Sequence, residues 1–299
     1  MMKNLLRLSL LVLLLACGVK ADHWGALLGF PPDPPEEEGG KPRRHYYQGM
    51  DVYGDIMVSL QDEGYATVYR LGASSFEKIS AFKLASFQKY NHSNVASFGI
   101  EKAQAGDPLP VLYVSQCHKK PVEEGKDVCF VERFAPDLQS SEVVQIIKYD
   151  DVNGDYGYAL QWVVDLKEKM LYGYGNTVNN SDPSNRHRIV KFRLPKLSDG
   201  SFVVLKPDDA LENYTIEEVS SFKFNPIGQG LYIYKGKLYM PTGIGTEKYP
   251  SILYVWDLKK RSMKEIDLSG CTTGELEDIS LYRGRFLIQG QDGLFCVKL

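Results

Sequence analysis

Residues 229–239 read Gln-Gly-Leu-Tyr-Ile-Tyr-Lys-Gly-Lys-Leu-Tyr. Apolar and polar side chains alternate around the Lys-Gly pair, which predicts two strands joined by the two-residue turn of a β-hairpin. The same design returns at 277–287, 48 residues later, and also occurs at 48–57. Four-stranded propeller blades repeat at about this spacing and close a core only by stacking on their copies. The sequence therefore predicts an all-β fold, a β-propeller.

Turn-forming residues divide the chain after residue 45 into strand-sized segments, four to a blade. This division assigns four strands to each of the first four blades. The outermost strand of the third blade is expected at 202–205. The segment from residue 279 onward contains three strands. The last blade therefore needs a fourth strand from the other end of the chain, either from about Arg43 onward or from 23–30. We expect five blades, because six would require shorter blades.

The first residues have the pattern of an export signal. A short positive region contains Lys3 and Arg7, and the run at 5–15 is almost wholly apolar. This run is too short to span a bilayer comfortably, and it predicts a signal peptide over residues 1–16.

Residues 14–18, Leu-Leu-Ala-Cys-Gly, resemble the bacterial lipobox. The resemblance implies that Cys17 becomes the lipid-modified first residue of the mature chain and anchors it to a membrane of the bacterial cell envelope, expected to be the outer membrane. The alternative is an ordinary cleaved signal with an incidental cysteine. Residues 17–44 are rich in proline and glutamate and are expected to form an extended tether, followed by the propeller domain at 45–299.

Charge and composition exclude several classes of partner. The chain has 35 Lys and Arg against 38 Asp and Glu, a formal net charge of −3, and it lacks a basic stripe. This balance argues against nucleic acid as a partner. No C-x-x-C pair or histidine cluster indicates a zinc site, so we expect neither a metal nor another cofactor. We also expect the protein to be a monomer.

Four cysteines follow Cys17. Cys117 and Cys129 lie almost symmetrically about a turn on two strand-like segments, and an exported protein allows such a pair to oxidise, so a disulfide is predicted. The alternative is that both are small buried hydrophobic residues. Cys271 and Cys296 could pair only if the loop before the last blade folds back onto that blade.

Polar residues stand where the innermost strand of each blade should begin, at Gln48, Asn94 (with His92 two residues before it), Gln229, Glu277 and a less well aligned position near Gln161. Innermost strands of a propeller start at its central channel, so these side chains should converge and could hold a small polar ligand. The alternative is that they bond to neighbouring blades and trapped water. Glu277 is the sharpest candidate, because a lone carboxylate in a channel should have a raised pKa and could serve as a general acid or base.

Three segments of the last two blades resemble the five-bladed glutaminyl cyclotransferase propellers. They are Ile-Gly-Gln-Gly-Leu at 227–231, Leu-Tyr-Met-Pro-Thr-Gly at 238–243 and Glu-Asp-Ile-Ser at 277–280. The resemblance implies that Gln229 and Glu277 line an active centre, although Asp278 replaces the glycine of that family.

A broader resemblance, to lipoprotein-anchored β-propellers of the Bacteroidota, rests on the lipobox, on Gln-Gly-Met at 48–50 and on His-Ser-Asn-Val-Ala-Ser-Phe at 92–98. It implies an envelope location and no reaction.

The expected function is therefore a non-enzymatic binding or scaffold module at the cell envelope, which holds a small polar ligand, a glycan or a partner protein. The alternative is a propeller enzyme, either similar to glutaminyl cyclotransferases or a glycosidase. In that enzyme Glu277 would act as acid or base, while Gln48, Asn94 and Gln229 would orient the substrate. A glycosidase would need further carboxylates on the inner strands.

Overall fold

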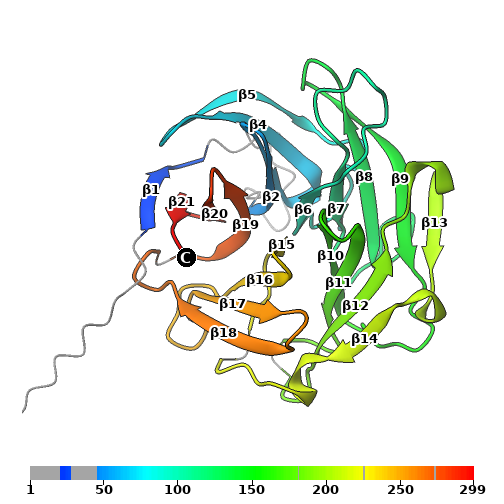
Figure 1. The fold of residues 1–299 in the computed structure, drawn as a ribbon, viewed down its shortest axis with the longest axis vertical. Coiled ribbons are helices and arrows are strands. Elements are labelled where there is room, and N and C mark those ends of the chain that lie inside the picture. Colours follow the sequence, from blue (N-terminus) through cyan, green and yellow to red (C-terminus); the bar gives the residue numbers. More distant parts are fainter. Residues whose placement is uncertain (1–20, 28–45, 181, 225, 273) are drawn as a thin grey trace, which may run out of the picture.

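The computed structural model describes residues 21–27, 46–180, 182–224, 226–272 and 274–299. In this part of the chain five β-sheets surround one axis, as Figure 1 shows. The predicted five-bladed β-propeller is confirmed. Among the described residues no helix is long and apolar enough to cross a membrane.

Each blade is a sheet whose strands follow chain order from the axis outward, except that the outermost strand of blade 5 is β1, the first strand of the chain. Blade 1 contains β2 (Tyr47–Tyr53), β3 (Ile56–Gln61), β4 (Tyr65–Leu71) and β5 (Phe76–Lys83). Blade 2 contains β6 (Ala96–Phe98), β7 (Leu112–Ser115), β8 (Val128–Phe134), β9 (Ser141–Tyr149) and β13 (Phe202–Leu205). Blade 3 contains β10 (Ala159–Asp165), β11 (Met170–Asn176), β12 (His187–Arg193) and β14 (Glu212–Thr215).

Blade 4 contains β15 (Tyr232–Tyr234), β16 (Lys237–Thr242), β17 (Ile252–Asp257) and β18 (Ser262–Asp267). Blade 5 contains β19 (Leu276–Tyr282), β20 (Arg285–Gly290), β21 (Gly293–Val297) and β1 (Ala21–Gly25). Short 3₁₀ turns connect some of the described strands, at η1 (Asp62–Gly64), η2 (Leu197–Asp199), η3 (Pro207–Asp209) and η4 (Ile216–Glu218).

The hairpins that predicted the fold are present with the expected turns. Lys235 and Gly236 between β15 and β16 have φ of 50° and 70°, and Arg283 and Gly284 between β19 and β20 have φ of 48° and 75°. Positive φ at both central residues is the geometry of the type I′ turn, whose twist matches that of the flanking strands.

One strand lies in a different blade from the one predicted. Residues 202–205 form β13, which pairs in parallel with β9 as a fifth strand of blade 2. The outer strand of blade 3 is β14, which pairs with β12 (Arg188 opposite Thr215). The chain therefore crosses to the neighbouring blade and returns before completing its own. A strand of four residues carries too little pattern to specify its partner.

The ring closes through the N-terminal segment. β1 runs antiparallel to β21, with Ala21 opposite Val297, and supplies the fourth strand of blade 5. This strand overlaps the start of 23–30, one of the two predicted sources. It also means that part of the predicted 17–44 tether belongs to the propeller. The signal peptide and Cys17 lie outside the described residues.

The hydrophobic core lies between blades. In the described part of the chain, five clusters of buried apolar side chains lie mainly between two adjacent blades; for example, Val68 and Phe82 of blade 1 pack in one cluster with Leu112 and Phe130 of blade 2. A blade without neighbours would leave both faces in water, so stacking supplies most of the stabilisation.

Candidate functional site

The polar side chains predicted to converge do so. Gln48, Asn94, Gln161 and Gln229 are all buried near the starts of the innermost strands. Asn94 Nδ2 donates to Gln48 Oε1 at 3.4 Å, and Gln161 Nε2 donates to Asn94 Oδ1. Gln161 Nε2 also donates to the backbone oxygen of Gln229 at 2.6 Å. These contacts link blades 1, 2, 3 and 4 around the axis, so these side chains bond to neighbouring blades.

These side chains also border a cavity of about 490 Å³. Among the described residues, seven amide side chains line it, from Gln48, Asn94, Gln161, Asn176, Asn180, Gln229 and Gln291. The remaining polar lining comes from Asp62, Glu275, His92, His118, Lys119, Cys117 and the tyrosines 46, 158 and 174. We call this space the axial cavity. The carbonyl oxygen Oε1 of Gln161 is buried there without a hydrogen-bond partner among the described residues.

Two irregularities in strand pairing aim side chains at the axis. The register of β2 against β3 shifts between Tyr47 and Met50, and that of β19 against β20 shifts between Leu276 and Asp278. Gln48 and Glu277 lie within these shifts. An extra residue in one strand bends it and redirects a side chain, which is a common device beside functional sites.

Glu277 lies beneath the axial cavity. Its side chain is buried, with 1% of the residue exposed, and the amide of Gln291, which does line the cavity, donates to its Oε1 at 2.5 Å. The second oxygen, Oε2, has no partner among the described residues. Burial, together with the negative charge of Glu275, raises the pKa of Glu277 well above its usual value of 4.5. This is the direction expected for a buried carboxylate, but Gln291, and not Glu277, lines the cavity.

Glu275, like Asp62, is a carboxylate that lines the cavity directly. It accepts a hydrogen bond from Gln229 Nε2 at 2.5 Å, and burial raises its pKa. The sequence analysis did not identify it. The repeat carried no signal for it, because it lies just before β19 and next to the register shift that contains Glu277.

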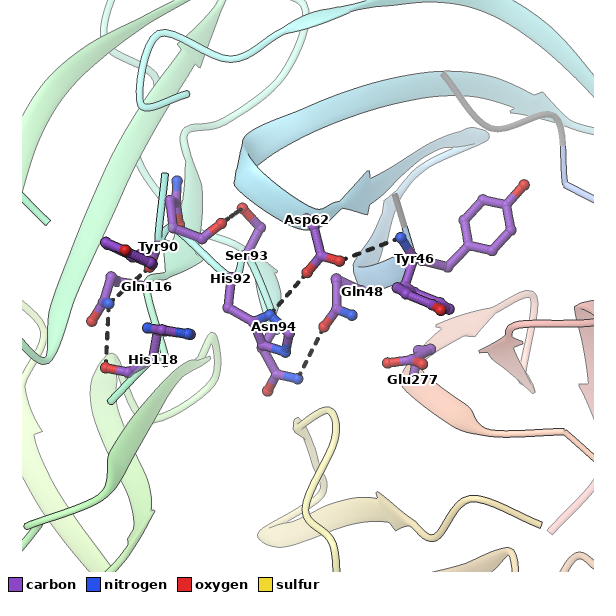
Figure 2. A network of polar contacts seen from close by, with 12 residues as sticks. Tyr46, Gln48, Asp62, Tyr90, His92, Ser93, Asn94, Gln116, His118 and Glu277 are labelled. Carbon is purple, nitrogen blue, oxygen red and sulfur yellow. Dashed lines mark hydrogen bonds and ion pairs between the residues drawn. The ribbon is translucent and has the colours of Figure 1, made fainter. Parts of the chain in front are cut away.

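A second unpredicted residue pairs with a predicted one. The ring nitrogen Nδ1 of His92 lies 2.9 Å from Oδ1 of Asp62, at the end of β3, and the backbone N–H of Tyr46 donates to Asp62 Oδ2 at 3.4 Å. The ring of His118 lies 6.3 Å from that of His92 and stacks on Tyr90. Figure 2 shows these residues side by side with Gln48 and Asn94, and Glu277 on the neighbouring blade.

Below the cavity, one carboxylate ties several blades together. Asp278 accepts backbone N–H groups from Met50 at 2.7 Å, Ala96 at 3.3 Å and Leu231 at 3.0 Å. Such close approach requires glycine on the facing strand, because a Cβ on Gly230 would lie 2.1 Å from Asp278 Oδ1. The Gln-Gly pairs thus combine an axial amide with a point of close blade contact.

The predicted Cys117–Cys129 disulfide is not formed. Both are free thiols, and Ser115 rather than Cys117 lies opposite Cys129 in the β7–β8 ladder. Cys129 is buried in the core between blades 2 and 3, as the alternative reading held, whereas Cys117 faces the axial cavity. Burial raises the pKa of Cys117 to about 12. Cys296 is also a free thiol, so the second possible disulfide, between Cys271 and Cys296, is not formed either.

Among the described residues no group of three or more His, Cys, Asp or Glu side chains could hold a metal ion. No protein-family model matches the chain, and no curated protein matches it. Solved structures do resemble it. The tail fibre of Staphylococcus aureus phage P68 has 11% identity and a TM-score of 0.53, over 93% of this chain and 52% of that one. The glutaminyl cyclase of Myxococcus xanthus has 12% identity and a TM-score of 0.48, over 85% and 93%. At these identities the likeness is one of fold alone.

Proposed function

We propose that this protein is a non-enzymatic binding module that holds a small polyhydroxylated ligand, a glycan unit, in the axial cavity. The observation that carries the proposal is the convergence of seven amide side chains from several blades on one space, with Gln161 Oε1 still without a partner among the described residues. A buried polar oxygen left unbonded costs free energy, so a ligand that donates to it would gain affinity.

The chemistry of the lining favours hydroxyl groups. An amide side chain both donates and accepts hydrogen bonds, as a hydroxyl does, so each can satisfy the other in either direction. Tyr46 and Tyr158 add aromatic rings on which the apolar side of a sugar could lie. Asp62 and Glu275 add acceptors, whereas the cation in the lining, Lys119, is exposed at its edge.

An enzyme is the second candidate, and one observation favours it. Glu277 is buried with a raised pKa and an unbonded oxygen, which are properties of a general acid. For Glu277 to reach a substrate, Gln291 would have to move, since its amide occupies the path from the cavity. We therefore rank binding above catalysis.

The location remains part of the proposal. The lipobox-like residues 14–18 support attachment through Cys17 to a bacterial envelope membrane, where a glycan ligand would be accessible. Metabolic labelling with a fatty-acid probe tests this, because a Cys17→Ser protein should lose the label.

The ligand proposal is tested by thermal unfolding of the protein with a panel of monosaccharides and disaccharides, calcium and a peptide with N-terminal glutamine. A binding sugar should raise the unfolding midpoint by an amount that grows with its concentration. Glu275→Gln and Gln161→Leu should abolish the rise, while Gln139→Leu, on an exposed loop outside the cavity, should retain it.

If the peptide alone raises the midpoint, and only when Glu277 is present, the enzyme reading replaces the glycan reading. If no compound in the panel raises the midpoint, the binding proposal fails.

A further inference from the structure

Carboxylates are concentrated at the axial cavity. Asp62 of blade 1 and Glu275 of blade 5 line it, and Glu277 lies beneath it, bonded to Gln291 of the lining. Burial is the largest cause of the raised pKa of Glu275, and the negative charge of Asp62 adds to it. Burial also comes first for Glu277, and both Glu275 and Asp62 add to its shift. The three carboxylates therefore act on one another electrostatically.

The cationic groups of the lining balance these charges only in part. Nδ1 of His92 lies 2.9 Å from Asp62 Oδ1, but an imidazole is only partly charged near neutral pH. The pKa of His118 is lowered, chiefly by burial, and the backbone N–H of Lys120 donates to its Nδ1 at 3.0 Å, which favours the neutral ring. Lys119 is exposed at the edge. The lining thus favours a ligand that carries positive charge.

Glu275 and Gln161 offer acceptors for such a ligand. The carboxylate of Glu275 is bonded to a neutral group, the amide of Gln229, at 2.5 Å. Gln161 is 4% exposed, and its Nε2 already donates to Asn94 Oδ1 and to the backbone oxygen of Gln229. Its Oε1 has no partner among the described residues. This unbonded oxygen indicates a hydrogen-bond donor in the ligand, independently of the charges.

We infer that the ligand is an amino sugar, whose protonated amine lies against Glu275 while its hydroxyl groups bond to the axial amides. This inference rests on the proposed function. An ammonium group has three donors and no acceptor, which suits a lining of carboxylate and amide oxygens. Within the described residues the side chains do not form a group of three that could hold a metal ion, which favours an organic cation.

The test is calorimetric titration of the protein with glucosamine, galactosamine and mannosamine, each beside its N-acetyl derivative and its parent hexose. Acetylation keeps the nitrogen but removes the charge. For the series that binds, the free amine should bind at least about tenfold more tightly than either counterpart, because a hydrogen bond to a charged group is stronger than one between neutral groups. Added salt should reduce this preference.

Glu275→Gln should lower the affinity for the amino sugar at least about tenfold, to that of the parent hexose. Glutamine keeps the size of the side chain and an acceptor for Gln229 but not the charge. Asp62→Asn should weaken amine binding in the same direction, so the test does not depend on the folding of one variant. Glu247→Gln, which changes an exposed carboxylate outside the cavity, is the matched control and should bind as the native protein does.

Equal affinity for the amino sugar and its parent hexose would overturn the inference and leave the proposed function in place. A preference for the amine that survives both Glu275→Gln and Asp62→Asn would overturn it in the same way. If no sugar of any kind binds, the proposed function fails together with the inference.

Discussion

The carboxylate oxygen Oδ2 of Asp278 accepts the backbone N–H of Met50 at 2.7 Å, although 228 residues separate them in the sequence. The same side chain accepts N–H groups from Ala96 and Leu231, so one residue of blade 5 is bonded to blades 1, 2 and 4. Its oxygens are satisfied by backbone donors pointing at one buried point on the axis. Asp278 therefore links the blades by hydrogen bonds at the centre of the ring, whereas the apolar clusters link neighbouring blades by packing around it.

Replacing Asp278 with alanine should destabilise the protein by at least about 3 kcal/mol, because several buried N–H groups lose their acceptor together. Urea unfolding followed by tryptophan fluorescence measures this. Asp267→Ala, which removes an exposed carboxylate bonded to a nearby N–H, should cost much less. Equal losses of unfolding free energy in the two variants would contradict the role of Asp278 in linking the blades.

Gly230→Ala should be among the most damaging glycine substitutions. The added Cβ would lie 2.1 Å from Oδ1 and 2.5 Å from Cα of Asp278, so the two blades would have to separate. We expect a loss of about 3 kcal/mol or more in unfolding free energy. Gly270→Ala, where no atom lies within 4 Å of the added Cβ, serves as the control and should change stability by less than about 1 kcal/mol.

Glu277→Gln should change how stability depends on pH. The pKa of Glu277 is raised in the folded protein above its usual 4.5, so the folded state holds this proton more tightly than the unfolded state. Its contribution to stability is present at low pH and is lost as pH rises through the folded pKa. Glutamine does not titrate, so the stability of the Glu277→Gln variant does not fall with pH for this reason. Its stability relative to the native protein should therefore improve by on the order of 1 kcal/mol between about pH 5 and pH 8.

Urea unfolding at both pH values measures the difference, with the exposed Glu168→Gln as the control. A difference between Glu277→Gln and the native protein that does not vary with pH would contradict the shifted pKa of Glu277.

Deleting residues 1–28 should destabilise the protein, whereas deleting residues 1–20 should not. The longer deletion removes β1, unburies its partners and leaves β21 as an open edge that can pair with another chain. Loss of buried Leu27 alone should cost on the order of 2 kcal/mol. Thermal unfolding gives the stability, and light scattering gives the aggregation. A longer deletion as stable as the shorter one would show that β1 does not close the ring.

The repeat at 229–239 and 277–287 was sufficient to predict the fold, because hairpin alternation and the Lys-Gly and Arg-Gly turns are local properties. The swap of β13 into blade 2 was not predictable, since it depends on which sheet edge lies nearest in space. The position of β1 was predictable in outline. The last blade had only three strands in the sequence, which indicated that its fourth strand comes from the N-terminal end, and β1 overlaps the start of 23–30.

Gln48, Asn94 and Gln229 could be predicted because they recur at equivalent places in the repeat, whereas Gln161 was less well aligned. The amides of Asn176, Asn180 and Gln291, which also line the axial cavity, were not predicted. Asp62 and Glu275 could not be aligned in this way, as one lies in a turn after β3 and the other just before β19. The Cys117–Cys129 prediction was wrong because symmetry about a turn does not fix register. The strands pair with Ser115 opposite Cys129, so Cys117 lies beyond the ladder.

The closing strand also determines how the molecule would respond to mechanical force. β1 begins at Ala21, four residues after Cys17, and four extended residues reach at most about 14 Å. A pull applied at the N-terminus would therefore load the β1–β21 hydrogen bonds before any other strand pair. The strand that seals the ring is the first that tension would remove, so an anchor at Cys17 would make the integrity of the propeller depend on the force it carries.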